Sequence, residues 1–202
     1  MVTRTPFVPS DLVYRITNRL SRSWARGKLR HIAAFLLGGV PDGGSIIDIG
    51  SGKGMVARML RERGFRVTSV DIRDRSLPGT PTPVLYDGRT IPFDDGEFDC
   101  ALLLTVLHHT AEPSVVLREA ARVARAVIVI EDVFSNPVQK HLTFFTDSLF
   151  NLEFRGHPHT NKTDSEWRHT FRELDLDVAG FEGRRVLLFY RQHAYHLKKG
   201  PR

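Results

Sequence analysis

A segment in which three glycines follow an acidic residue is the strongest candidate for a ligand-binding turn: Asp48-Ile49-Gly50-Ser51-Gly52-Lys53-Gly54. Glycine allows the backbone to approach a ligand and to adopt positive φ without a Cβ clash. A dinucleotide fingerprint would need glycine where Met55 stands, and a phosphate-binding P-loop would need a hydroxyl residue directly after Gly52-Lys53. An acid before the glycines would repel a pyrophosphate, so the segment favours a ligand that carries positive charge.

The elements around this segment alternate between apolar runs and helical stretches. We predict strands at residues 45–49, 66–70, 84–86, 98–104 and 126–130, and helices at 53–63, at 113–125 and from 163 or 164 to about 174. This alternation predicts a parallel sheet with helices on both faces, with the glycine segment at the carboxyl end of a strand, where such sheets bind ligands. Two final strands, 176–181 and 185–190, joined by a turn at 182–184, should form a hairpin, which makes one of them antiparallel.

Positive charge is concentrated at the N-terminal end of the chain. Residues 1–40 contain seven basic residues and one acid, Asp11, so this segment carries the whole formal net charge of +6. A second helix is predicted at 29–37, after a first one in which apolar residues recur between arginines. The apolar residues at helical spacing are Leu12, Ile16, Leu20 and Trp24.

Four motifs, in this order, resemble those of class I S-adenosylmethionine-dependent methyltransferases, in particular the small-molecule branch (methyltransferase type 11) that includes ubiquinone-biosynthesis-type enzymes. The segments that carry the resemblance are residues 48–54, Asp71, Asp87-Gly88 with Ile91-Pro92-Phe93, and Leu107-His108-His109 with Glu112-Pro113. The resemblance covers roughly residues 30–190. It implies a Rossmann-like, doubly wound, seven-stranded α/β sheet with helices on both faces and an antiparallel C-terminal strand. It also implies S-adenosyl-L-methionine as the cofactor.

The resemblance implies a role for each residue of the cofactor site. Asp71 corresponds to the acid that binds the ribose hydroxyls, and Asp87 to the one that takes the adenine amino group. Thr105 should face the methionine portion, and Asp48 should act through loop amides or a water near that end. The expected cofactor-binding residues are Asp48, Gly50, Ser51, Gly52, Gly54, Asp71, Ile72, Asp87, Gly88 and Thr105.

Methyl transfer is an in-line displacement at a sulfonium, so positioning and desolvation can supply much of the acceleration. A base is needed only where the acceptor must lose a proton. His108 and His109 follow the fourth strand and are candidates for that base, or else they cap a helix or pack against the cofactor. Glu131, after the fifth strand, could orient a substrate hydroxyl or amine, or lie in a solvated loop; His141 is a further catalytic candidate.

The chain divides into two parts on this interpretation. Residues 1–40 form a basic N-terminal helical segment that covers the pocket, and residues 41–202 form the methyltransferase domain. Residues 133–162 interrupt the alternation with many aromatic side chains, at the place where the family commonly carries a substrate-covering lid. Their composition favours a partly apolar acceptor, such as a lipid-like or quinone-like molecule. The alternative is an ordinary pair of core helices.

The main hypothesis is therefore an enzyme that methylates a small or lipid-like acceptor. An RNA methyltransferase and a non-catalytic, cofactor-binding partner protein of the same fold are the alternatives. The basic N-terminal helix favours the RNA methyltransferase. However, the sequence contains neither an Asn-Pro-Pro-aromatic tetrad that would hold a flipped base nor a recognisable RNA-binding module, so nucleic acid is not the expected partner. An anionic acceptor or a peripheral contact with an anionic membrane would also suit that helix.

Composition limits the surroundings of the chain. The single cysteine, Cys100, cannot form an internal disulfide, which fits a reducing, cytoplasmic compartment. The apolar runs fall far short of the ~20 residues that a membrane span needs, so no integral membrane segment is expected. No metal is expected either, because His157, His159 and His169 lack a fourth ligand at a known spacing.

Overall fold

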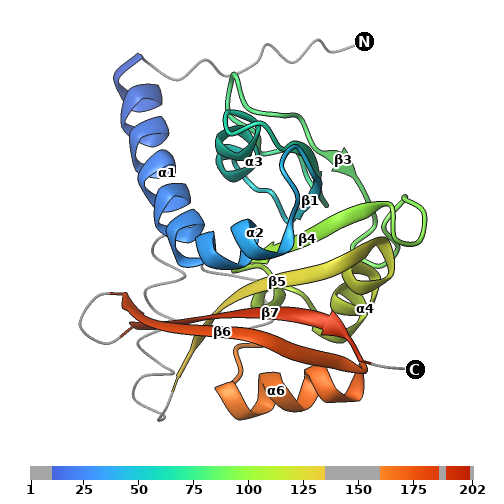
Figure 1. Cartoon of the computed structure of the whole chain (residues 1–202). Coiled ribbons are helices and arrows are strands. Elements are labelled where there is room, and N and C mark those ends of the chain that lie inside the picture. Colours follow the sequence, from blue (N-terminus) through green and yellow to red (C-terminus); the bar gives the residue numbers. More distant parts are fainter. Residues whose placement is uncertain (1–10, 135–159, 187–189, 201–202) are drawn as a thin grey trace.

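A mixed sheet organises the part of the chain that the computed structural model describes, namely residues 11–134, 160–186 and 190–200 (Figure 1). Its strand order is β3-β2-β1-β4-β5-β7-β6. The strands are β1 Ser45–Ile49, β2 Arg66–Asp71, β3 Val84–Leu85, β4 Phe98–Leu104, β5 Ala124–Val133, β6 Leu176–Val186 and β7 Tyr190–Lys199. Strands β1 to β5 run parallel, and β7 pairs antiparallel with both β5 and β6. The seven-stranded, Rossmann-like architecture with a reversed C-terminal strand is confirmed.

Helices cover both faces of this sheet, as expected. They are α1 Asp11–His31, α2 Ala33–Gly39, α3 Met55–Arg61, α4 Pro113–Val123, α6 Asp164–Glu173 and a short 3₁₀ turn, η1 Leu107–His109. Side chains alternate between the faces along each strand. In β4, Leu102 packs against α1, α2 and α3, whereas Leu103 packs against α4 and α6. The central strands are therefore buried on both faces, which explains their unbroken apolar runs.

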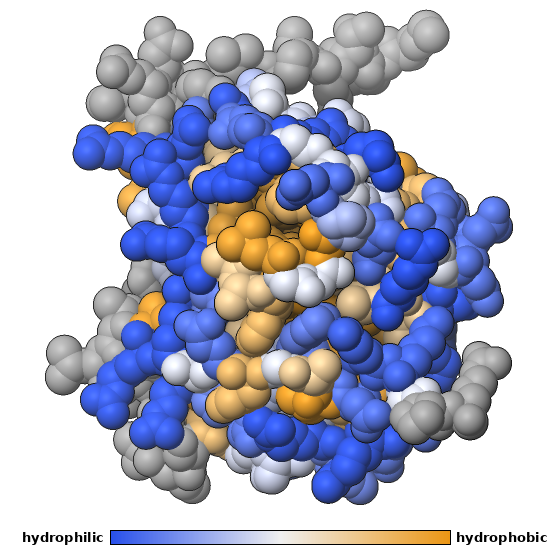
Figure 2. Space-filling view, viewed as in Figure 1, coloured by the Kyte–Doolittle hydropathy of each residue, from blue (hydrophilic) through white to orange (hydrophobic). Residues whose placement is uncertain are grey.

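The N-terminal helices are part of this core. α1 is continuous to His31, where the sequence indicated a break before residue 29, and α2 follows directly. Leu29 is 6% exposed and shares an apolar cluster with strand residues such as Leu102 and Ile130. Leu37 on α2, in contrast, is 79% exposed, and apolar surface lies over α2 in the middle of the view in Figure 2.

The predicted turn at residues 182–184 is wrong. These residues continue β6 and pair with β7, with Glu182 opposite Ala194 and Gly183 opposite His193. β6 runs on to Val186, into the predicted second strand, and β7 begins only at Tyr190, where that predicted strand ended, and runs to Lys199. A glycine between charged residues weakly favours a turn, but ten cross-strand partners and the packing of β7 against β5 outweigh that local preference.

Several smaller boundaries also moved. The predicted helix at 53–63 is shortened to α3, and the predicted strand at 126–130 is lengthened to β5. The predicted lid at 133–162 lies outside the described residues except at its two ends, and His141 falls in that part. Within the described ranges, no helix is both long and apolar enough to cross a membrane.

Replacing Leu29 tests whether α1 is integral to the domain. Leu29→Ala should lower the free energy of unfolding by about 2–5 kcal/mol, because it leaves a cavity between α1 and the sheet. Leu37→Ala makes the same chemical change at an exposed site on α2, so it should change stability by no more than about 0.5 kcal/mol. Urea unfolding of both variants measures the difference, and equal effects would show that α1 packs only loosely.

Candidate active site

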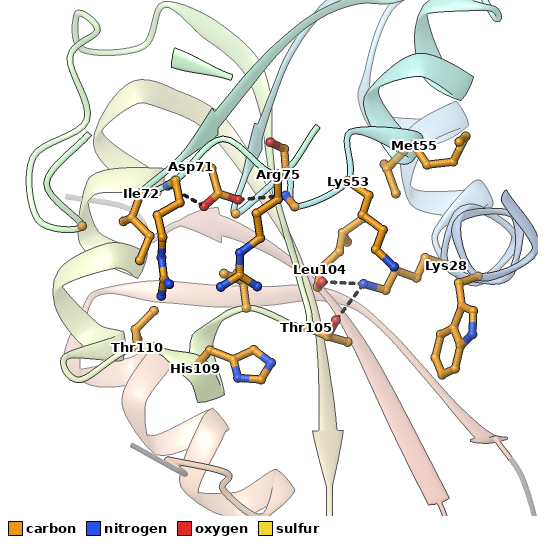
Figure 3. Close-up of a pocket in the computed structure, with 18 of the residues that line it drawn as sticks. Lys28, Lys53, Met55, Asp71, Ile72, Arg75, Leu104, Thr105, His109 and Thr110 are labelled. Carbon is orange, nitrogen blue, oxygen red and sulfur yellow. Dashed lines mark hydrogen bonds between the residues drawn. The ribbon is translucent and has the colours of Figure 1, made fainter. Parts of the chain in front are cut away.

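A cavity of about 870 Å³ opens at the carboxyl ends of the strands, where the order reverses between β1 and β4 (Figure 3). Its walls are the glycine turn at 50–53, the end of β2, residues 86–89 and the turn after β4. α1 supplies a further side through residues that include Leu20, Trp24 and Lys28. Open α/β sheets bind ligands in this crevice.

The glycine turn owes its shape to the absence of side chains. Gly50, Gly52 and Gly54 all have positive φ, of 70°, 53° and 70°. A Cβ on Gly50 would overlap the side chain of Val106, and one on Gly54 would lie 2.7 Å from the Thr80 hydroxyl oxygen. The turn can therefore pack against both neighbouring loops only with glycine at these positions.

Asp71 ends β2 with its carboxylate held at the cavity. One oxygen accepts a hydrogen bond from the Gly52 amide at 2.8 Å, and the other accepts one from the Arg73 amide at 3.2 Å. Figure 3 shows the side chain between the glycine turn and Ile72. Ile72 follows directly, 53% exposed, and offers an apolar surface beside the carboxylate.

Asp87 is fixed by a local turn. Its Oδ1 accepts hydrogen bonds from the amides of Arg89 and Thr90 at 2.8 and 2.7 Å. These amides, the Thr90 amide foremost, lower the pKa of the Asp87 carboxyl. The carboxylate therefore stands ionised at the cavity wall, next to Gly88.

Asp48 lies behind the glycine turn and does not line the cavity. Burial raises the pKa of its carboxyl to about 7, an effect that the nearby Lys28 ammonium opposes. Its Oδ2 is buried without a hydrogen-bond partner among the described residues. The carboxyl contributes charge beneath the turn rather than a direct contact surface.

Lys28 brings a buried ammonium from α1 into the cavity. Its Nζ donates to the Leu104 carbonyl at 2.8 Å and to the Thr105 hydroxyl at 2.7 Å (Figure 3). Burial lowers the pKa of this ammonium, and the carboxylates of Asp132, Asp48 and Glu131 oppose that shift. An ammonium has three N–H donors, so one remains for a ligand.

The sequence interpretation assigned Lys28 no role at the cofactor site, because this lysine counted only as one of the seven basic residues of the N-terminal segment. A signal was present: Lys28 continues the four-residue spacing of Ile16, Leu20 and Trp24. A lysine in line with an apolar stripe faces the same side of the helix as that stripe. Thr105, which accepts its hydrogen bond, has the unusual φ of 60° for a residue with a Cβ.

Glu131 and His108 lie behind the cavity wall. Glu131 is fully buried, and its Oε1 accepts from the amides of Val106 and Leu107 at 3.1 and 2.8 Å. Its Oε2 lies 2.5 Å from His108 Nδ1. The carboxylate thus holds the turn after β4 in shape, and neither side chain is placed to touch a ligand in the cavity.

His109 and Asp132 do line the cavity. The His109 ring contacts the buried His108 ring, with 4.1 Å between the ring centroids, and Figure 3 shows His109 beside Thr105. Asp132 Oδ1 accepts from Gln192 Nε2 at 2.9 Å. A polar chain continues from Gln192 through Arg184, which donates to its Oε1 at 2.9 Å. Asp132 and Gln192 therefore make the lining of the cavity polar on the side near α1.

Most of the expected cofactor residues come together at the cavity. Those that line it are Gly50, Ser51, Gly52, Asp71, Ile72, Asp87, Gly88 and Thr105. Asp48 and Gly54 lie just outside its wall and shape the turn from behind. Among the described residues, no group of three or more His, Cys, Asp or Glu side chains is arranged to hold a metal ion.

Known proteins share this sequence pattern and fold. Residues 47–127 match the family described as a methyltransferase domain. An uncharacterized methyltransferase of Mycobacterium sp. (strain JLS) is 30% identical over 169 residues, or 76% of this chain and 67% of that protein. A ubiquinone biosynthesis O-methyltransferase of Idiomarina loihiensis is 28% identical over 91 residues, or 40% of this chain and 37% of that protein. The structure of magnesium protoporphyrin IX methyltransferase from Synechocystis PCC 6803 with bound SAH has a TM-score of 0.62 at 16% identity, covering 98% of this chain and 90% of that one.

The order of the motifs, the reversed C-terminal strand and these relatives agree. The chain belongs to the class I S-adenosylmethionine-dependent methyltransferases, enzymes that use S-adenosylmethionine as the methyl donor. It spans less than half the length of the ubiquinone enzyme that it matches.

The buried carboxyl behind the glycine turn should make stability depend on pH. The pKa of Asp48 is about 7 in the folded chain, above its ordinary value of 3.8, so the folded state binds the proton more tightly between these values. The contribution of Asp48 to the free energy of unfolding should therefore fall as pH rises from about 4 to about 7, by at most ~4 kcal/mol, and then level off.

Asp48→Asn removes this titration. Urea unfolding at pH 5 and pH 8 should show that the variant gains stability relative to the parent chain as pH rises. Asp94→Asn, in an exposed loop, is the matched control and should follow the parent at both values. Parallel profiles for the Asp48 variant and the parent would contradict the role assigned to burial.

Proposed function

We propose that this chain transfers the methyl group of S-adenosylmethionine to a small or lipid-like acceptor, and that it does so in the cytoplasm, the reducing compartment that its single cysteine fits. The observation that carries the proposal is the division of one cavity into two unlike sides. Acids and glycines at the ends of β1, β2 and β3 suit the cofactor, whereas Leu20, Trp24, His109 and Asp132 surround the remaining space. Small-molecule sites combine apolar walls with a few convergent polar groups in this way.

The residues of the first side fit the cofactor group by group. Asp71 presents its carboxyl oxygens to the two ribose hydroxyls, and Ile72 offers an apolar surface for the adenine. Asp87 is placed to accept from the adenine amino group. The third N–H of Lys28 suits the carboxylate at the methionine end of the cofactor. The acids near Lys28, namely Asp132, Asp48 and Glu131, favour the positive charge of the cofactor's ammonium and sulfonium.

The second side fits an acceptor that must lose a proton. S-adenosylmethionine, when bound, supplies a methyl group on a sulfonium that leaves as a neutral thioether. His109, which lines the cavity, would accept the proton that the acceptor hydroxyl or amine loses. Asp132, fixed by Gln192, orients that hydroxyl or amine. Glu131 and His108 act as positioning residues, because they hold the turn that carries His109.

Two ligands separate the roles of Asp71 and Lys28. S-adenosylhomocysteine contains both the ribose and the amino-acid end, whereas 5′-methylthioadenosine contains only the ribose end. Asp71→Ala should weaken both ligands by at least about 10-fold, because each hydrogen bond to a charged group contributes about 1.5–3 kcal/mol. Asp94→Ala, remote from the cavity, is the matched control and should change neither affinity. No calorimetric binding of S-adenosylhomocysteine to the parent chain would end the proposal.

Lys28→Met should weaken S-adenosylhomocysteine by at least about 10-fold, since it removes one charge-assisted contact. It should leave the affinity for 5′-methylthioadenosine within about twofold, which also shows that the cavity still forms. An equal loss for both ligands would mean that Lys28 acts by holding α1 rather than by contacting the amino-acid end.

A further inference from the structure

One side of α1 carries an exposed apolar stripe. Ile16, Leu20 and Trp24 recur every fourth residue and are 51%, 58% and 45% exposed. Residues at this spacing lie along one side of a helix. Large apolar side chains exposed in a row on a surface helix mark a site of contact with another apolar surface.

Arginines occupy the neighbouring side of the same helix. Arg19, Arg26 and Arg30 are exposed, and none of them forms an ion pair with a described residue, whereas Arg22 pairs with Glu62 at 3.3 Å. Figure 2 shows hydrophilic side chains along α1 at the left of the molecule. α1 therefore presents an apolar stripe bordered by cations that no carboxylate of the described residues neutralises.

Two residues of the stripe also form part of the rim of the cavity. Leu20 and Trp24 are exposed and line the cavity at the same time, and the next residues around the helix, Ser21, Ala25 and Lys28, face its interior. A surface that covers the stripe would thus meet the opening through which an acceptor reaches His109.

We infer that α1 binds peripherally to an anionic lipid surface, with the stripe of Ile16, Leu20 and Trp24 in the interface and the flanking arginines on lipid headgroups. Basic amphipathic helices with Trp and Leu on the apolar side bind bilayers in this orientation. The arginines are attracted to the negative surface potential. The inference rests on the proposed function, since it delivers a lipid-like acceptor to the mouth of the cavity. RNA would satisfy the arginines but would leave the apolar stripe without a partner.

The two tryptophans provide a probe of this contact in the unmodified chain. Trp24 is 45% exposed, whereas Trp167 is fully buried, so a change in emission on binding reports Trp24. Vesicles of phosphatidylcholine with about 30% phosphatidylglycerol should shift the emission to shorter wavelength and sediment with the protein. Vesicles of pure phosphatidylcholine should bind at least about 10-fold more weakly, and added salt should weaken the anionic binding. No difference between the two compositions would overturn the inference.

Charge-matched variants locate the contact. The triple variant Arg19→Gln, Arg26→Gln, Arg30→Gln should lose at least about 10-fold in affinity for the anionic vesicles. The control, Arg66→Gln, Arg118→Gln, Arg172→Gln, removes the same charge from exposed arginines on β2, α4 and α6 and should retain binding. Ile16→Ser, which does not line the cavity, should weaken binding without changing the charge. Equal losses for the two triple variants would reduce the effect to net charge and overturn the inference.

Binding of S-adenosylhomocysteine without lipid keeps this test separate from the proposed function. Both triple variants should bind that ligand as the parent does, because none of their arginines lines the cavity. Ligand binding without vesicle binding would refute the membrane contact alone. Retention of single-stranded RNA by the parent, lost in the α1 variant and accompanied by no vesicle binding, would assign the surface to nucleic acid instead.

Discussion

The ammonium of Lys28 is the contact that joins the two elements meeting at the α1 side of the cavity. It joins α1 to the end of β4 through the Leu104 carbonyl and the Thr105 hydroxyl, and it faces three carboxylates, those of Asp132, Asp48 and Glu131. A buried charge is tolerated only where it is paired and hydrogen-bonded. If α1 moved away, Lys28 would lose both hydrogen bonds, and the three acids would lose the ammonium that they face. The wall that α1 contributes is therefore held electrostatically as well as by packing.

A second buried polar group fixes the turn after β4. Glu131 lies near the end of β5. Its carboxyl accepts hydrogen bonds from two backbone amides of the turn after β4 and contacts His108. The two adjacent histidines therefore have different surroundings, since one is tied to the carboxylate behind the wall and the other faces the cavity. His108 is a positioning residue and His109 faces the ligand because Glu131, on β5, binds the turn that follows β4.

The basic residues of the N-terminal segment whose side chains the structure describes have three kinds of surroundings. The Lys28 ammonium lies at the cavity, Arg22 is paired with Glu62, and Arg19, Arg26 and Arg30 face solvent beside the apolar stripe. Of these described cations, the last group is the one available to attract an anionic partner. A net charge of +6 therefore describes no single property of the molecule, because each cation acts through its own surroundings.

The sequence by itself determined the parallel sheet, the reversed final strand and the ligand-binding turn. Alternating apolar runs encode strands buried on both faces, and the turn at Gly50 and Gly54 admits only residues without a Cβ. Only the tertiary structure decided where the C-terminal hairpin turns, since the pairing of Gly183 with His193 is not written in the local sequence. The same holds for Lys28 and Asp48, because the burial of a charge depends on which distant elements meet around it, and spacing along the chain does not encode that meeting.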